Sequence, residues 1–219
     1  MHAMSGSMRE MYHLRFGEEV ANCVTLGIMA LLCLFALPAS AIYSYTKGGT
    51  ILAAGVSIFI LCLFLMFTVS TLYHCMPYDT THKYIFRKLD HICIYFAIAG
   101  SYTPIALTLI GGWQGFLILA IEWIAVLCGV LLKAISTKSL PKLSMTIYMV
   151  MGWTAIFFLP TLLSKASIPF LALIIGGGLM YTIGAFFYSK PQKAYFHSIW
   201  HVCINIASIL HFIAIVFVM

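Results

Sequence analysis

Charged side chains are scarce in this sequence. Only 8% of its 219 residues are Asp, Glu, Lys or Arg, and just six of those are acidic. A soluble globular protein carries roughly 25% charged residues, so this chain has too few to cover a surface that faces water. The shortage excludes a soluble enzyme, a nucleic-acid-binding domain and a disordered chain.

Cysteine motifs are also missing. No C-x-x-C occurs, and the seven cysteines are odd in number and lie mostly inside apolar stretches. Thiolate ligands of a structural zinc ion come in closely spaced pairs. A disulfide framework or a thiolate zinc site is therefore not expected, and the cysteines are interpreted as small residues of an apolar core.

Hydrophobic residues, by contrast, make up 63% of the chain, and the mean hydropathy is +1.03. They form continuous runs of about 20 residues, long enough to cross a bilayer as helices, and they do not alternate as barrel strands would. We therefore expect an all-α integral membrane protein, one domain over residues 1–219 with a short cytoplasmic tail over 1–17. Seven transmembrane helices are predicted, at residues 20–43, 51–73, 89–110, 113–135, 143–162, 168–188 and 196–219.

Basic residues fall mostly on one side of this predicted bundle. The N-terminal tail and the second, fourth and sixth loops hold ten Lys and Arg residues, whereas the other side holds only Lys47 and Lys165. Basic loops stay in the cytoplasm, so the N-terminus is predicted to be cytoplasmic and the C-terminus outside. An alternative is a signal-peptidase site at residues 37–41. Against it, Glu18 and Glu19 stand where a signal peptide has basic residues.

Five polar side chains lie inside the predicted spans at one depth. Ser70 and His74 are four residues apart, so they share a helix face, and His197 and His201 repeat that spacing on the seventh span. Asp90 lies near the start of the third span. The predicted topology brings all five to the cytoplasmic end of the bundle. Because ionisable groups inside a membrane are costly, their convergence indicates a functional site.

Histidine spacing at this site is typical of metal binding. Two histidines four apart on a helix can bind one ion, and His197, His201 and His74 together provide three nitrogen ligands. Such a set leaves a fourth position for water, as in a catalytic zinc site. Asp90 is then a candidate general base, and Ser70 a candidate hydrogen-bonding partner. The alternative is that the histidines only form hydrogen bonds between helices.

Two further ionisable residues stand apart from this set. Glu122, in the middle of the fourth span, marks either an ion path or a structural hydrogen bond. His211 lies ten residues beyond His201, about 15 Å along a helix. It therefore cannot share that metal, and a packing or hydrogen-bonding role is expected.

Five stretches of the sequence carry a family resemblance: residues 18–22 (EEVAN), 70–74 (STLYH), 89–95 (LDHICIY), 99–104 (AGSYTP) and 197–201 (HSIWH). Together they resemble the hemolysin III family, the bacterial branch of the progestin and adipoQ receptors, which is related to alkaline ceramidases. The resemblance implies zinc bound by His74, His197 and His201, with Ser70 and Asp90 beside it. One position departs from the family pattern, because Leu26 follows Thr25 where members often have His.

The main functional hypothesis is a zinc-dependent hydrolase that cleaves an amide or ester of a membrane lipid. It would reside in the bacterial inner membrane and act in membrane homeostasis. The alternative is a non-enzymatic membrane-lipid sensor or homeostasis factor with structural zinc, or a lytic protein, as the family name implies. A channel or transporter that uses Glu122 is the third hypothesis. Lipid is the expected partner in each case, and nucleic acid is not.

Overall fold

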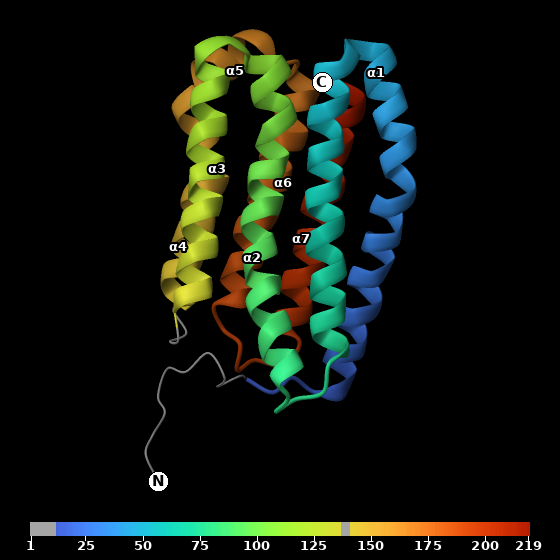
Figure 1. Cartoon of the computed structure of the whole chain (residues 1–219), viewed down its shortest axis with the longest axis vertical. Helices are drawn as coiled ribbons and strands as arrows, with labels where there is room; N and C mark the ends of the chain where they lie inside the picture. Colours follow the sequence, from blue (N-terminus) through green and yellow to red (C-terminus); the bar gives the residue numbers. More distant parts are fainter. Residues whose placement is uncertain (1–11, 137–140) are drawn as a thin grey trace.

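All elements of the described chain are helical. A computed structural model describes residues 12–136 and 141–219, and Figure 1 shows them as an elongated bundle of helices. Within these residues, six helices are long and apolar enough to cross a membrane. The prediction of an all-helical multi-pass membrane protein is therefore confirmed. The elements in chain order are α1 (Phe16–Cys75), α2 (Thr81–Pro104), η1 (Ile105–Ile110), α3 (Gly112–Ile135), α4 (Pro141–Gly152), η2 (Thr154–Phe158), α5 (Leu159–Lys165), α6 (Ile168–Tyr188), α7 (Phe196–Phe212) and η3 (Ile213–Val218).

The longest helix, α1, folds back on itself. Gly48 and Gly49 leave the helical conformation, and Gly49 has φ of +72°, a value that suits glycine because it lacks Cβ. This break falls where the sequence predicts one. The residues on either side, 16–47 and 50–75, are here called the first and second limbs. They run antiparallel, since the Cys23 sulfur meets the Cys75 sulfur (Figure 1).

Helix α2 begins earlier than the sequence analysis placed it. The polar run up to Lys88 was expected to be a loop containing His82 and Lys83, but the helix already starts at Thr81. The Thr80 hydroxyl accepts a hydrogen bond from the Lys83 backbone N–H and so caps the helix. The Lys83 side chain is fully buried. In the sequence the charge of Lys83 indicates a loop that faces water, because nothing local reveals that this side chain is buried.

The predicted fifth span is broken into three pieces, α4, η2 and α5. Tyr102 of α2 supplies the hydrogen bonds at the first break. Its hydroxyl donates to the Gly152 carbonyl oxygen over 2.8 Å and accepts from the Ala155 N–H over 3.0 Å. Backbone groups inside a bilayer must be satisfied by the protein itself. The side chain from α2 therefore stabilises this irregular segment.

Helices α6 and α7 approach closely at a glycine. A Cβ added at Gly177 would lie 2.3 Å from the His211 ring, so only glycine leaves room for this side chain. The His211 Nε2 atom is 3.2 Å from the Ile174 carbonyl oxygen. The predicted packing or hydrogen-bonding role of His211 is confirmed.

The interior of the bundle is made by α1, α2 and α7. In their most apolar stretches, 50%, 50% and 44% of the residues are buried, against 17–28% in the other membrane-length helices of the described chain. At one end of the bundle, Lys47 donates to the Phe217 carbonyl and Lys165 to the Ile110 carbonyl. These lysines satisfy the last carbonyls of η3 and η1. Several other ionisable residues of the three interior helices gather at the opposite end, away from Lys47 and His211.

Candidate metal centre

Four chain segments meet at that opposite end. They are the start of the first limb, the end of the second limb, the first turns of α2 and the first turns of α7. They carry Ser70, His74, Asp90, His197 and His201, the five residues that the sequence analysis brings to one depth. The second limb ends here because Met76 adopts an extended conformation.

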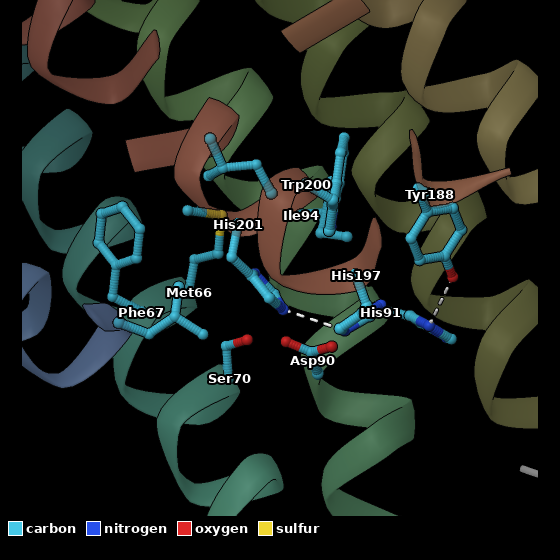
Figure 2. A pocket seen from close by; sticks show the side chains of 12 residues that line it. Met66, Phe67, Ser70, Asp90, His91, Ile94, Tyr188, His197, Trp200 and His201 are labelled. Atoms are coloured by element: carbon cyan, nitrogen blue, oxygen red, sulfur yellow. Dashed lines mark hydrogen bonds between the residues drawn. The ribbon is translucent and has the colours of Figure 1, made fainter. Parts of the chain in front are cut away.

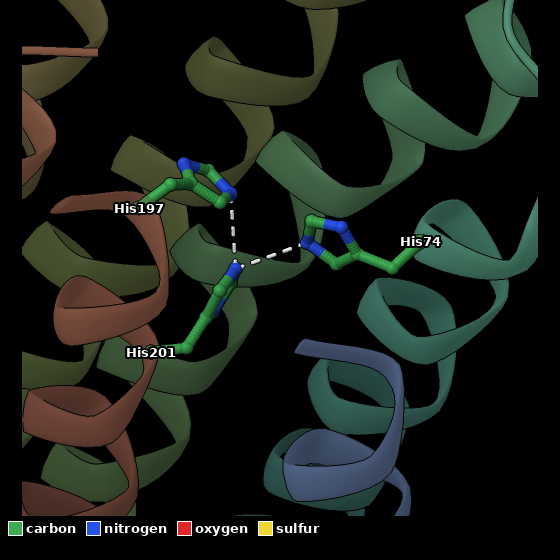
Figure 3. Close-up of side chains that lie close together, drawn as sticks. All are labelled: His74, His197 and His201. Atoms are coloured by element: carbon green, nitrogen blue, oxygen red, sulfur yellow. Dashed lines mark hydrogen bonds between the residues drawn. The ribbon is translucent and has the colours of Figure 1, made fainter. Parts of the chain in front are cut away.

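Three imidazole nitrogens converge on one point. The Nε2 atom of His201 lies 3.0 Å from Nε2 of His74 and 3.0 Å from Nε2 of His197 (Figure 3). His74 and His201 are buried and His197 is partly buried. The three ligand atoms all lie within 4.8 Å of one another, so this group could hold a metal ion.

Hydrogen bonds alone cannot satisfy this arrangement. A ring nitrogen carries either one proton or one lone pair, yet Nε2 of His201 faces two other Nε2 atoms at hydrogen-bonding distance. That nitrogen can direct its single proton or lone pair at only one of the two partners, so a hydrogen bond leaves the second contact unsatisfied, whereas a cation between the three nitrogens can accept a lone pair from each. With Zn–N bonds of 2.0–2.1 Å, tetrahedral ligand nitrogens stand about 3.3 Å apart. The cluster accordingly fits one small metal ion.

The outer nitrogen of His74 is held by a carboxylate that the sequence analysis missed. Glu19 places Oε2 2.5 Å from His74 Nδ1, and its Oε1 accepts from the ammonium of Lys83 over 2.6 Å. A carboxylate in this position fixes the orientation of a metal-binding histidine and directs its other nitrogen inward. The signals in the sequence were an adjacent pair of acids, Glu18 and Glu19, in a chain with six acids, and their place in the stretch 18–22 that carries the family resemblance.

Lys83 and Tyr78 complete the surroundings of Glu19. The Lys83 ammonium also donates to the Met76 carbonyl over 3.1 Å and lies 4.0 Å from the centre of the Tyr78 ring. Burial and the hydrogen bond to Glu19 raise the pKa of Tyr78, so its hydroxyl stays protonated and can donate to the carboxylate. The Tyr78 oxygen also accepts from the Leu14 N–H. The carboxylate is thus surrounded by donors.

The neighbouring acid, Glu18, fixes the start of α7. Its Oε1 accepts from the Tyr195 N–H over 2.6 Å, and its Oε2 accepts from the Arg15 N–H over 3.1 Å. Tyr195 precedes α7 and has φ of +62°, an uncommon value for a residue with a side chain. His197 follows two residues later. Two adjacent carboxylates of the first limb therefore position His74 and the helix that carries His197 and His201.

A small cavity lies beside the histidines. It measures about 20 Å³, counted as the space open to the centre of a water-sized sphere, enough for about one water molecule. Ser70 and Asp90 both line it and lie next to each other (Figure 2). The remaining wall is largely apolar, with side chains from four helical segments: Leu26, Met66, Phe67, Ile94, Trp200 and Ile204.

His91 lines the same cavity but is bound on its far side. Its Nε2 is 3.3 Å from the Tyr188 hydroxyl (Figure 2). Its Nδ1 is 3.4 Å from the Lys133 ammonium. The Tyr148 hydroxyl donates to its backbone carbonyl over 2.7 Å. These contacts join α2 to α3, α4 and α6, so His91 connects the cavity to the outer helices.

Other ionisable residues lie apart from the cavity. Glu122 is fully buried on α3 but is not among the residues that line the cavity. Arg9 and Lys138, two of the basic residues used to predict the orientation, lie outside the described residues.

These features define a multi-pass helical membrane protein whose bundle encloses a histidine cluster able to hold a metal ion. The family model described as Haemolysin-III related matches residues 14–212, so the chain belongs to the haemolysin III family, as its motifs predict. It is 32% identical to Hemolysin-3 of Bacillus cereus over 200 residues, and this match covers 91% of each of the two chains. It is 35% identical over 184 residues to the Hemolysin-3 homolog of Bacillus subtilis (strain 168), covering 84% of this chain and 86% of that one. The human Monocyte to macrophage differentiation factor is 26% identical over 204 residues, 90% of this chain and 83% of the relative.

Proposed function

We propose that this protein is a zinc-dependent hydrolase that cleaves an amide or ester of a membrane lipid. The observation that carries the proposal is the cavity lined by Ser70 and Asp90 together with two of the three clustered histidines, His197 and His201. A metal-ion site, a carboxylate and room for one water are the parts that hydrolysis of a carbonyl compound needs.

Each residue has a definite task in this proposal. His74, His197 and His201 hold the zinc ion. Zinc bound by three histidines lowers the pKa of a water in its open position to about 7 and polarises a carbonyl oxygen. Asp90 accepts a proton from water in the cavity and returns it to the leaving group. The Ser70 hydroxyl keeps the Asp90 carboxylate turned toward the cavity, and the apolar wall receives an acyl chain.

Metal content is the first test. Purified wild-type protein should contain about one zinc per chain, and His197→Ala and His201→Ala should contain almost none, because each removes a ligand. His211→Gln is the matched control, since His211 lies on the same helix and bonds to a backbone carbonyl instead. It should keep its zinc. Wild-type protein without zinc after zinc is added back would contradict the proposal.

Product formation tests the catalytic step. The protein is incubated in vesicles of total bacterial polar lipid, and released fatty acids and lyso-products are measured by mass spectrometry. Wild type and His211→Gln should release a product, whereas His201→Ala and Asp90→Asn should lose at least about 100-fold in rate, as expected when a general base is removed. Equal rates in all four proteins would contradict the hydrolase.

The small size of the cavity favours a second candidate, in which zinc is structural. A space of about 20 Å³ holds a water but no lipid headgroup. In this case the protein is a membrane-lipid sensor or homeostasis factor, and His201→Ala lowers the temperature of unfolding while no vesicle yields a product. The measurement of product formation therefore separates the candidates, because both predict the same zinc content.

We also propose that the chain crosses the bacterial inner membrane seven times, with its N-terminus in the cytoplasm. Sixty residues of α-helix rise about 90 Å, and a bilayer core is about 30 Å thick. The break at Gly48 and Gly49 and the antiparallel limbs support two crossings by α1. The excess of Lys and Arg at the end that holds the histidines supports a cytoplasmic location of the site.

A further inference from the structure

Cys23 and Cys75 form a contact that the metal site does not use. Their sulfur atoms lie 2.7 Å apart, although the residues are 52 positions apart in the sequence. Cys23 is on the first limb and partly buried, and Cys75 is the last residue of the second limb and exposed. A disulfide bond is about 2.05 Å long, so the sulfurs need to move by less than about 1 Å to form one.

The pair spans the same two limbs as the contact between Glu19 and His74. Cys23 is one turn of helix beyond Glu19, and Cys75 directly follows His74. A covalent bond here ties the end of the second limb to the first limb beside the histidine cluster. We propose that Cys23 and Cys75 are a reversible oxidation site, at which a peroxide forms a disulfide that fixes His74 in place.

The chemistry needs only the two thiols and a peroxide. The exposed Cys75 sulfur attacks an oxygen of hydrogen peroxide, the O–O bond breaks, and a sulfenic acid and one water form. The Cys23 sulfur then attacks the Cys75 sulfur, the S–O bond breaks, and the oxygen leaves as a second water with the Cys23 proton. The two sulfurs lose two electrons and the peroxide gains them. A dithiol reductant restores both thiols by exchange.

Cys128 provides a control for the cross-link within the same chain. Cys128 on α3 is also exposed, but among the described residues its sulfur contacts no second cysteine. It should react with a maleimide before and after the peroxide treatment, because it has no second sulfur with which to form an intramolecular cross-link. The remaining cysteines are buried: Cys33, Cys62, Cys93 and Cys203.

The test uses full-length protein in detergent, reduced, desalted and treated with hydrogen peroxide. Alkylation in denaturant should detect seven thiols before treatment and, with two consumed, five after it. A peptide map should contain one Cys23–Cys75 cross-link that dithiothreitol removes. Cys128→Ser should retain this cross-link, and Cys23→Ser should lose it. The absence of the cross-linked peptide from peroxide-treated wild type would overturn the proposal, whether or not the variants fold.

A second measurement tests the effect on the histidines and rests on the proposed zinc site. Zinc is loaded, and its loss to a chelator is followed in reduced and oxidised protein. Oxidised wild type and Cys128→Ser should lose zinc several-fold more slowly than the reduced forms, and Cys23→Ser should show no difference. Equal rates in oxidised and reduced wild type would overturn the claim that the bond fixes His74. A chain that binds no zinc in either state would contradict the proposed function. It would leave the proposed oxidation site untouched, because the cross-link is measured without metal.

Discussion

Glu19 is the residue that connects the candidate site to its surroundings, although it is not among the residues that line the cavity beside the histidines. It links a fully buried lysine to a buried histidine, and each of these groups alone would be costly to bury. The pairing lets a charged residue lie inside the bundle and, at the same time, fixes the ring of His74. In the proposed metal site, this side chain therefore couples stability to metal binding.

Replacing Glu19 should weaken metal binding without removing a ligand. In Glu19→Gln the His74 ring loses its carboxylate partner, and the affinity for zinc should fall by about 10–100-fold, the usual effect of losing such a partner. Competition with a chelator of known affinity measures this. Asp79→Asn is the control, because Asp79 lies at the same end of the bundle with its side chain 85% exposed. An unchanged affinity in Glu19→Gln would show that the carboxylate does not orient His74.

Replacing Lys83 should affect stability first. Lys83→Met leaves Glu19 without its cation, and removing one partner of a buried ion pair costs about 3 kcal/mol or more. The temperature of unfolding in detergent should fall clearly. Lys142→Met removes an exposed lysine and should change it little. A Lys83→Met protein as stable as the Lys142→Met protein would mean that the pair contributes no stability.

Among the elements, α6 and α7 approach closely at one of the three glycines of residues 176–178. Gly177 faces the His211 ring, whereas a Cβ at Gly178 meets nothing within 4 Å. The run of glycines at residues 176–178 therefore contains positions with opposite requirements. Helix α7 carries two of the three histidines, so its packing against α6 also determines where these two side chains lie.

Alanine at these two positions should have opposite effects. Gly177→Ala forces the His211 ring aside and should destabilise the protein by about 1–3 kcal/mol. Gly178→Ala fills open space and removes the flexibility of glycine in a helix, so it should stabilise by about 0.5–1 kcal/mol. Thermal unfolding of both variants beside wild type measures the difference. The same shift in both would contradict the close approach of α6 and α7.

At the scale of the whole molecule, the two ends of the bundle differ in character. One end carries the histidines and the predicted cytoplasmic loops, and at the other Lys47 and Lys165 are bound to helix-terminal carbonyls. Fusions to alkaline phosphatase, which is active only outside the inner membrane, show on which side of the membrane each fusion point lies. Fusions after residues 48 and 166 should be active, and those after 79 and 192 inactive. Activity after residue 79 but not after 48 would contradict the proposed seven crossings.

The sequence predicted the helical class, the glycine breaks and the convergence of the five site residues, because each depends on local spacing or on apolar length. It did not predict Glu19 or Lys83 beside the histidines, since their partners lie 55 and 64 positions away. The pieces of the fifth span were missed for a similar reason. Tyr102, 53 positions from Ala155, satisfies that backbone, and no local pattern reveals such a contact.

The distribution of the histidines along the chain has a consequence for biosynthesis. His74 and His201 are 127 residues apart, and α7 is the last α-helix of this chain to be translated. At about 5–20 residues per second, the ribosome needs on the order of 6 to 25 seconds between the two codons. A nascent chain lacking α7 contributes a single ring to the cluster. The cluster able to hold a metal ion is thus complete only once α7 has been translated, and a prematurely terminated fragment would lack two of its three rings.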